Sequence, residues 1–351
     1  MQIHLPNFKF GHLEFDQKQI SFKKSVDRQR KDALYFFIYM TSMNIKPKII
    51  VLCGSTGIGK THTATTLARM YNGEIIGADS MQIYRRMDIG TAKPTAEEQA
   101  SVPHHMIDVV EPDEPFDAAR YSAMARKIMT NLCQRQIIPF IVGGTGLYIR
   151  ALIHGIFPSP PSDPAVRGRL KKEAGTCGPA FLHRRLCACD PEAAGRIHPN
   201  DAFRIIRALE VYQLTGLPLS LQQAGHGFVE QPYTVLKTGL HLDREILYKR
   251  INYRVDAMIS QGLVDEVRTL LAAGYSPELK SMQSIGYRHM IDYLENRLAW
   301  DEAVRTLKRD TRRYAKRQMT WLRGDTEIHW FEPGRINSMQ QQITAFLNAD
   351  R

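Results

Sequence analysis

One segment of this chain limits the possible folds more than any other, and it reads KIIVLCGSTGIGKT. An apolar run from Ile49 to Leu52 leads directly into glycine-rich sequence. Gly54, Gly57 and Gly59 can take backbone angles that are closed to other residues, so successive amide N–H groups can surround an anionic oxygen. This order predicts a buried strand that ends in a phosphate-binding loop.

The residues after the last glycine support a phosphate ligand. Lys60 adds a positive charge, and Thr61 opens a helix whose positive end would point at the same phosphates. The Thr61 hydroxyl can also reach a Mg²⁺ ion. A glycine turn that only connects two elements is the alternative, but the strand-to-helix context favours the phosphate loop. We therefore expect a diphosphate or triphosphate ligand.

The next part of the chain alternates between short apolar runs and helical patterns. Strands are predicted over Gly73–Asp79, Pro103–Val110 and Ile137–Val142, with helices over Lys60–Tyr71 and Asp117–Gln136. This alternation predicts an α/β fold with a mostly parallel sheet, similar to the core of the P-loop nucleotide hydrolases. Ligands of such sheets collect at the carboxyl ends of strands. The carboxylate that ends the first of these strands, Asp79, is therefore expected near the phosphate loop.

A change of composition marks a second region. The sequence PSPPSDP at residues 158–164 would interrupt a helix or a central strand. Helical, strand-poor sequence follows, so residues 158–234 are predicted to form a helical insert. A strand over Val235–Leu240 then returns the chain to the core, which comprises residues 43–157 and 235–351. Helices are predicted within the insert and after it, over Val166–Glu173, Phe181–Ala188, Ala202–Gln213, Arg244–Ala273, His289–Asn296 and Asp301–Arg323.

The charge balance indicates a polyanionic partner. The 351 residues carry 47 basic and 36 acidic side chains, a formal charge of +11. The helix from Val304 to Arg323 is strongly basic, and contact with phosphates is favoured there over a merely solvated face. Leu307, Tyr314 and Trp321, spaced by seven, are expected to face the core.

The remaining composition predicts a cytoplasmic protein that is not inserted in a membrane. Five cysteines form neither CxxC pairs nor zinc-type clusters, so they are expected to be reduced thiols. No apolar run approaches the length of a membrane span. Residues 1–42 fit neither a transit peptide nor a secretory signal, and we interpret them as a disordered extension or a start-site artefact.

Further motifs follow the phosphate loop in a characteristic order. They are ADSMQIYR from Ala78, IGTAKP from Ile89, PHHMID from Pro103, IVGGTGLY from Ile141, HPND from His198, RALE from Arg207 and KRQMTWLRG from Lys316. Together they resemble the tRNA dimethylallyltransferases, also called tRNA isopentenyltransferases, over roughly Met43 to the C-terminus. The resemblance implies transfer of a dimethylallyl group from dimethylallyl diphosphate to the exocyclic amine of the adenosine immediately 3′ of the anticodon.

The resemblance also assigns roles at the donor side. Asp79 would accept the amine proton and hold the amine, although an N-cap or a magnesium ligand is the alternative for this side chain. Thr56 would touch the donor near the reacting carbon, and Arg254 would help to hold the diphosphate unless it is only a surface charge. Mg²⁺ is the expected cofactor, with Thr61 as a ligand. The expected diphosphate-binding residues are Gly54, Ser55, Thr56, Gly57, Ile58, Gly59, Lys60, Thr61 and Arg254.

The same resemblance places contacts with the tRNA anticodon stem-loop. Thr145 and Arg167 match positions at the entrance of a channel, and Phe203 could either stack on a base or belong to the core. Three histidines, His104, His105 and His198, are interpreted as structural because no companion ligands stand at metal spacing. The expected tRNA-contact residues are Asp79, Ser80, Met81, Gln82, Thr145, Arg167, Phe203, Arg204, Ile205, Ile206, Arg207, Gln283, Ser284, Ile285, Gly286, Tyr287 and Arg288.

The chain departs from the family pattern at two points, and two other functions are possible alternatives. Ser55 stands where many relatives carry proline, and no zinc-finger pattern follows the core, so a bacterial-type enzyme is implied. A small-molecule kinase could use the same loop for ATP, with Asp79 deprotonating a hydroxyl. A non-catalytic RNA-binding module is the other alternative. A monomer is the simplest expectation, because one chain supplies the whole site.

Overall fold

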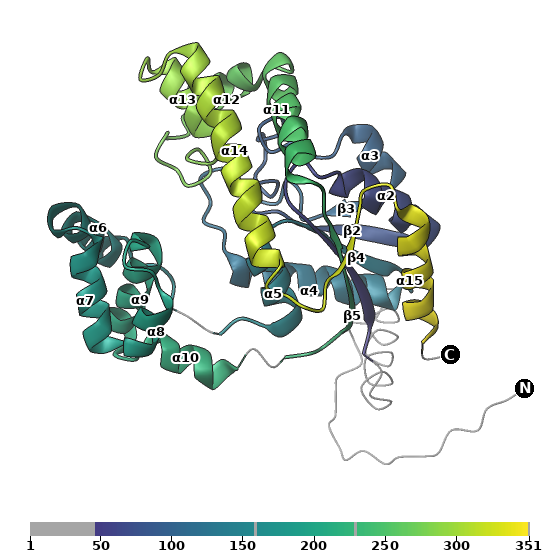
Figure 1. Ribbon diagram of the computed structural model, residues 1–351, viewed down its shortest axis with the longest axis horizontal. Coiled ribbons are helices and arrows are strands. Elements are labelled where there is room, and N and C mark those ends of the chain that lie inside the picture. Colours follow the sequence, from purple (N-terminus) through teal and green to yellow (C-terminus); the bar gives the residue numbers. More distant parts are fainter. Residues whose placement is uncertain (1–45, 158–159, 228–229, 350–351) are drawn as a thin grey trace, which may run out of the picture. The chain divides into compact units, whose positions relative to one another are not determined.

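The computed structural model describes residues 46–157, 160–227 and 230–349, and the predicted extension over residues 1–42 lies outside this part. Its centre is a six-stranded sheet in the order β3-β2-β4-β1-β5-β6 (Figure 1). Each neighbouring pair of strands runs parallel. The predicted parallel α/β fold is therefore confirmed. The strands are β1 (Lys48–Cys53), β2 (Gly73–Ala78), β3 (His104–His105), β4 (Ile138–Gly143), β5 (Thr234–Leu240) and β6 (His329–Phe331).

Alternate residues of β1 build the two layers of core on either side of the sheet. Ile49 and Val51 pack into a cluster that includes residues of α4 (Ala118–Gln134) and α5 (Gly146–His154). Ile50 and Leu52 pack instead with α2 (Lys60–Met70) and α15 (Ile336–Asn348). This is the period-2 alternation of a strand that is buried on both faces, as expected for a parallel sheet covered by helices.

Two sequence predictions about the core elements were wrong in extent. The strand expected over Pro103–Val110 is reduced to β3, because Met106 and Asp108 have left-handed backbone angles with φ of 63° and 53°. The single helix expected over Arg244–Ala273 is two helices, α11 (Arg244–Ser260) and α12 (Leu263–Ala272). Gly262 separates them with φ of 99°, which a helix cannot accommodate.

The predicted helical insert forms a bundle with its own core. It consists of α6 (Pro164–Cys177), α7 (Pro179–Cys189), α8 (Pro191–Arg196), α9 (Ala202–Thr215) and α10 (Leu219–His226). A separate cluster that includes Leu170, Leu182, Leu186 and Ile205 fills the space between these helices. Proline at N1 or N2 begins α6, α7 and α8, where a missing N–H costs no helical hydrogen bond.

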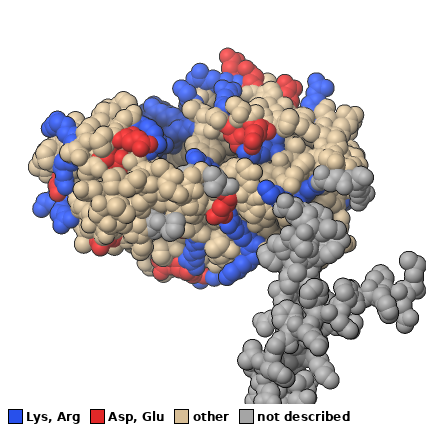
Figure 2. Space-filling view, turned by 90° about the horizontal axis from the view of Figure 1, so that it is seen from below, with Lys and Arg blue, Asp and Glu red and all other residues tan. Residues whose placement is uncertain are grey.

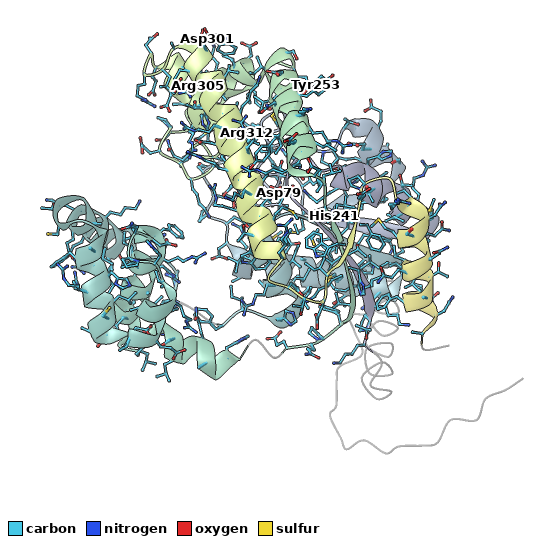
Figure 3. The ribbon with its side chains drawn as sticks, viewed as in Figure 1. Asp79, His241, Tyr253, Asp301, Arg305 and Arg312 are labelled. Atoms are coloured by element: carbon cyan, nitrogen blue, oxygen red, sulfur yellow. The ribbon has the colours of Figure 1, made fainter. Side chains whose placement is uncertain are left out.

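The basic helix predicted over Asp301–Arg323 is α14 (Trp300–Leu322), which lies beside α11 and α13 (Tyr287–Leu294) (Figure 1). Leu307 is buried as predicted, but Trp321 is 42% exposed, so the expectation that it faces the core was wrong. Figure 3 shows Arg305 and Arg312 on α14, with Asp301 near its first turn. α3 (Ala96–Ser101) completes the described helices.

Candidate active site

Two cavities open at the carboxyl edge of the sheet. The first is lined by the phosphate loop, the ends of β2 and β4, and Arg250 and Arg254 of α11, and its volume is about 310 Å³. The second has a similar volume of about 310 Å³ and lies among α11, α14 and the segment 283–288. Both cavities are lined by Thr56, Asp79, Thr91 and Arg254. These four residues therefore form a shared border, from which both spaces can be reached.

The phosphate loop has the geometry that its glycines predict. Gly57 and Gly59 have φ of 77° and 103°, and Gly59 caps the N-terminus of α2. A Cβ at Gly57 would lie 3.0 Å from the Ile251 side chain, so the loop packs closely under α11. The Lys60 ammonium group donates to the Ser55 carbonyl at 2.8 Å, which bends this side chain back over the loop. Backbone amides, a helix N-terminus and one cation thus face the first cavity.

Lys60 and Arg254 are half-buried cations in the wall of the first cavity. The pKa of Lys60 is lowered to about 8, mainly by burial, with Asp79 opposing the shift and Arg254 adding to it. Burial also lowers the pKa of Arg254, again opposed by Asp79. Within the part of the chain that the structure describes, neither side chain forms an ion pair with a carboxylate, even though such pairing is usual for buried charges. Two desolvated cations in one cavity favour an anionic ligand.

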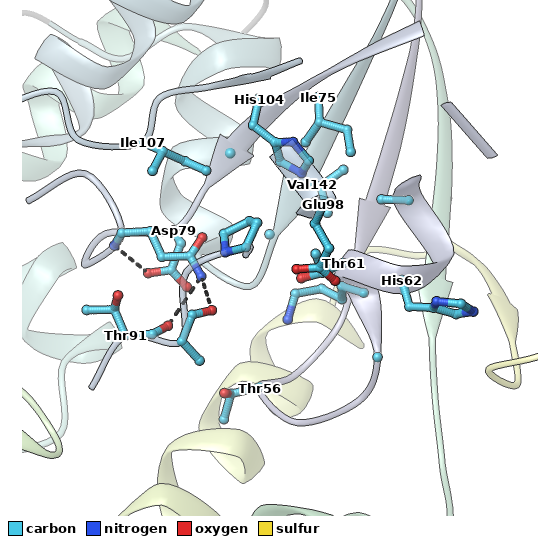
Figure 4. A pocket seen from close by; sticks show the side chains of 18 of the residues that line it. Thr56, Thr61, His62, Ile75, Asp79, Thr91, Glu98, His104, Ile107 and Val142 are labelled. Carbon is cyan, nitrogen blue, oxygen red and sulfur yellow. Dashed lines mark hydrogen bonds between the residues drawn. The ribbon is translucent and has the colours of Figure 1, made fainter. Parts of the chain in front are cut away.

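Asp79 stands on the border between the two cavities (Figure 4). Its Oδ1 atom accepts the N–H of Met81 at 2.8 Å and, more weakly, the N–H of Gln82 at 3.4 Å. The side chain therefore caps the turn that follows β2. It is not a helix N-cap, because the next described helix begins at Ala96. Because these contacts use Oδ1, Oδ2 remains to accept a proton or a hydrogen bond from a ligand. Figure 4 shows Thr56 across an open space from Asp79 and Thr91.

The second cavity is less polar than the first, and cationic side chains lie in its wall. Met258, Leu307 and Ile285 supply apolar lining, while Arg288 and Arg317 supply charge. Arg288 donates to Asp310 Oδ2 at 2.8 Å. Burial disfavours the charged form of Asp310, but hydrogen bonds from Arg309, His289 and Arg288 outweigh it and lower its pKa to about 2. Asp310 is thus a permanent anion that orients these cations.

A carboxylate that the sequence analysis missed supports the wall of this cavity. Glu266 of α12 accepts the N–H groups of Asp88, Ile89 and Gly90 at 2.7 to 3.0 Å. The Tyr287 hydroxyl also donates to Glu266, at 2.5 Å. Glu266 therefore fixes the IGTAKP segment against the segment that contains Gln283–Arg288. Its position in a continuous predicted helix gave no sign of this role.

The expected tRNA-contact residues lie partly around the two cavities and partly in the insert. Asp79, Ser80, Met81, and Gln283 to Gly286 with Arg288 line the second cavity, whereas Tyr287 is fully buried beneath it. Gln82 lines the first cavity, and Thr145 accepts the Ser80 N–H at 3.1 Å. The remaining expected contacts, Arg167 and Phe203 to Arg207, belong to the insert.

The insert presents some of its expected contact side chains and buries others. Phe203 is 76% exposed, which decides between the stacking and core alternatives in favour of a surface side chain. Ile205 and Ile206 lie in the insert core, so Phe203, Arg204 and Arg207 are the side chains of this segment that reach the surface. Figure 2 shows Lys and Arg side chains gathered in a recess of the described surface, with acidic side chains beside them.

The three histidines make local contacts. His104 bonds to the Val102 carbonyl at 2.7 Å, His105 to Glu74 at 2.6 Å, and His198 accepts the Asn200 N–H at 3.1 Å. Among the described residues, no group of three or more His, Cys, Asp or Glu side chains could hold a metal ion. No described helix is long and apolar enough to cross a lipid bilayer.

Comparison with known proteins shows one family relationship over most of the chain. The sequence profile described as IPP transferase matches residues 82–325, and the one described as isopentenyl transferase matches residues 47–111. A tRNA dimethylallyltransferase from Desulfosudis oleivorans is 57% identical over 82% of this chain and 91% of its own length. One from Desulfatibacillum aliphaticivorans is 54% identical over 87% of this chain and all of its own length.

Solved structures agree with the sequence relatives. The tRNA isopentenylpyrophosphate transferase from Bacillus halodurans has a TM-score of 0.65 and 42% identity, covering 87% of this chain and 98% of its own. A eukaryotic dimethylallyltransferase acting on tRNA has a TM-score of 0.70 and 27% identity, covering 86% of this chain and 80% of its own. The fold and the site define a phosphate-loop α/β enzyme with two cavities that meet at a carboxylate. The chain belongs to the IPP transferase family, as the resemblance of its motifs predicted.

Proposed function

We propose that this protein transfers a dimethylallyl group from dimethylallyl diphosphate to the exocyclic amine of the adenosine immediately 3′ of the anticodon in tRNAs, releasing diphosphate. One observation carries the proposal. A cavity lined by two half-buried cations, neither of which forms an ion pair with a described carboxylate, meets a second, less polar cavity at Asp79 and Thr56. An anionic donor and a nucleobase can thus reach one carboxylate from two directions.

The donor side suits departure of diphosphate. In the proposed reaction, the bond between the allylic carbon and the diphosphate oxygen breaks, and the leaving group takes the electron pair. The amides of the phosphate loop, Lys60 and Arg254 would stabilise the negative charge that develops there. Because these cations are already desolvated, they need little reorganisation as the bond breaks. No nucleotide hydrolysis is required for this step.

Magnesium fits the donor set of the first cavity. Thr61 and Glu98 both line this cavity, so hydroxyl, carboxylate and diphosphate oxygens would be available to the ion. When bound, Mg²⁺ would neutralise part of the charge on the leaving diphosphate. We propose that Thr61 is a protein ligand of this ion and that Asp79 accepts the proton.

The acceptor side suits an adenine that has left its stack. The exocyclic amine is a weak nucleophile, and its proton becomes acidic only as the new bond between nitrogen and carbon forms. A nearby carboxylate can then accept this proton. Asp79 Oδ2 would take this proton, while apolar side chains of the second cavity, including Met258 and Leu307, would cover the base.

The RNA around the base would be held by charge. Arg288 and Arg317 lie at the second cavity, and Arg204 and the exposed Phe203 lie on the insert. Cations and an aromatic surface are typical of sites for single-stranded loops. We propose the tRNA anticodon stem-loop as the partner. We further propose that the protein is a monomer, since residues of one chain line both cavities. We also propose that it acts in the cytoplasm.

The decisive experiment supplies radiolabelled dimethylallyl diphosphate and unmodified tRNA to the purified protein. We expect label in the RNA and release of unlabelled diphosphate. A parallel reaction with ATP and candidate small hydroxyl acceptors tests the kinase alternative. Release of ADP without transfer of label to RNA would contradict the proposal.

A further inference from the structure

Gln318 of α14 is a buried amide that joins the two glycine turns of the site. Its side chain is 6% exposed. Its Oε1 atom accepts the N–H of Thr56 at 2.9 Å, and its Nε2 atom donates to the carbonyl of Gly144 at 3.0 Å. These partners lie in the turns after β1 and β4. One side chain of α14 thus links both turns directly.

The fit around this amide is close. A Cβ at Gly144 would lie 2.2 Å from Gln318 Nε2 and 2.9 Å from the Gly54 carbonyl oxygen. The second turn can therefore approach Gln318 and the phosphate loop only because residue 144 is glycine. Loss of these partners would leave buried polar atoms without hydrogen bonds, so both bonds hold the amide in position.

Each end of this link leads to a group at the border of the cavities. Thr56 itself lines both cavities. After Gly144, the Thr145 N–H donates to the Ala78 carbonyl at 3.1 Å, and Thr145 Oγ1 accepts the Ser80 N–H at 3.1 Å. These contacts hold the residues on either side of Asp79. Gln318 therefore lies at the centre of a hydrogen-bonded chain from Thr56 to the backbone around Asp79.

We propose, on the basis of the transfer reaction proposed above, that Gln318 is a positioning residue that sets the separation between Thr56 and Asp79. It touches neither the donor nor the acceptor in this role. Because α14 also carries Tyr314 and Arg317 into the second cavity, the helix that would contact the RNA is the helix that holds the donor loop. Loss of Gln318 should therefore slow the chemical step much more than it weakens the binding of either substrate.

The test replaces Gln318 by methionine, which has a similar length but neither hydrogen bond. Misplacement of reacting groups by about 1 Å can cost roughly 100-fold in rate, so we expect kcat to fall by about 30- to 100-fold. The KM values for donor and tRNA should stay within a few-fold of the wild type. The matched control is Thr320→Val on the same helix. Among the described residues the Thr320 hydroxyl donates to the Lys316 carbonyl and to no other group, so this variant should keep the wild-type kcat.

A split between kcat and KM separates positioning from a role in folding or in RNA binding. Unchanged kcat in Gln318→Met, or a loss confined to the KM or affinity for tRNA, would overturn the proposal. Should this variant not fold, Gln318→Asn gives the same test, because its shorter amide cannot reach both turns. Label transfer by the wild-type protein is measured alongside. Its absence would refute the transfer reaction itself, whereas transfer with an unaffected variant would refute only the role of Gln318.

Discussion

The cations of the donor cavity and those of the acceptor-side surfaces are arranged in opposite ways. Lys60 and Arg254 are half-buried and form no ion pair with any described carboxylate. On the insert, Arg167 and Arg207 both bind Glu210, whose side chain is fully buried. Arg288 and Arg309 similarly share Asp310.

The difference indicates what each region recognises. Unpaired, desolvated cations gain most from a small and highly charged ligand, because its binding supplies the counter-charge that the protein lacks. Paired cations have fixed directions and keep spare N–H donors, which suits a large partner recognised by its shape and its spaced phosphates. The donor cavity would therefore recognise its ligand mainly by charge, and the acceptor side would recognise its partner mainly by the positions of its phosphates.

The largest expected effect comes from removing the carboxylate at the border of the two regions. Asp79→Asn keeps an oxygen for the Met81 N–H but cannot accept the amine proton, so kcat should fall about 1,000-fold while donor affinity persists. Single-turnover transfer to tRNA measures this. Asp108→Asn, at an exposed carboxylate paired with Lys93, is the control. A rate within tenfold of the wild type would remove Asp79 from the reaction.

The second-largest effect should distinguish the binding of diphosphate from the binding of tRNA. Lys60→Met should weaken binding of inorganic diphosphate by about 100-fold, because a charge-assisted contact contributes up to about 3 kcal/mol. Its affinity for tRNA should be unchanged, since Lys60 does not line the second cavity. Titration calorimetry with diphosphate and filter binding with tRNA give the two values. Equal losses in both would show that the regions are not distinct.

The affinity of the donor cavity for its ligand should also depend on pH. The free protein holds Lys60 with a pKa of about 8, and an anionic donor binds its protonated form. Affinity should therefore be constant below pH 8 and fall as the pH rises above it, by up to about tenfold per unit. The profile of kcat/KM for the donor measures this. A flat profile from pH 7 to pH 10 would contradict the role of Lys60, and the Lys60→Met variant should show that flat profile.

The smallest effect belongs to an exposed cation of the insert. Arg204→Met should reduce tRNA affinity only a few-fold and lower the slope of log affinity against log salt by about 0.7 to 0.9, the value for one phosphate contact. Diphosphate affinity should not change. Arg69→Met, an exposed cation of α2, serves as the control for general charge loss. An unchanged salt slope in Arg204→Met would exclude this phosphate contact.

Much of the donor side could be predicted because its signals are local. An apolar run, a glycine-rich loop and a following helix are contiguous in sequence, and they form β1, the cradle and α2. The placement of Asp79 followed from a general rule about strand ends. The break at Gly262 was missed because a single glycine is tolerated in many helical patterns.

The connections between distant segments could not be predicted in this way. Gln318 meets Thr56 across 262 residues, and Glu266 meets Gly90 across 176. Polar residues inside amphipathic helices look like solvent-facing positions until the packing of the helices is known. The prediction that Trp321 faces the core failed for the same reason. A spacing of seven places residues on one face of a helix but does not say how much of that face is covered.

The most direct test of the central claim is to locate the transferred group. After reaction of the wild-type protein with unmodified tRNA and dimethylallyl diphosphate, nuclease digestion and mass spectrometry identify the altered nucleoside and its position. We expect one dimethylallyl group on the exocyclic amine of the adenosine immediately 3′ of the anticodon. A group found elsewhere in the RNA, or RNA left unmodified while ATP is consumed, would contradict the account.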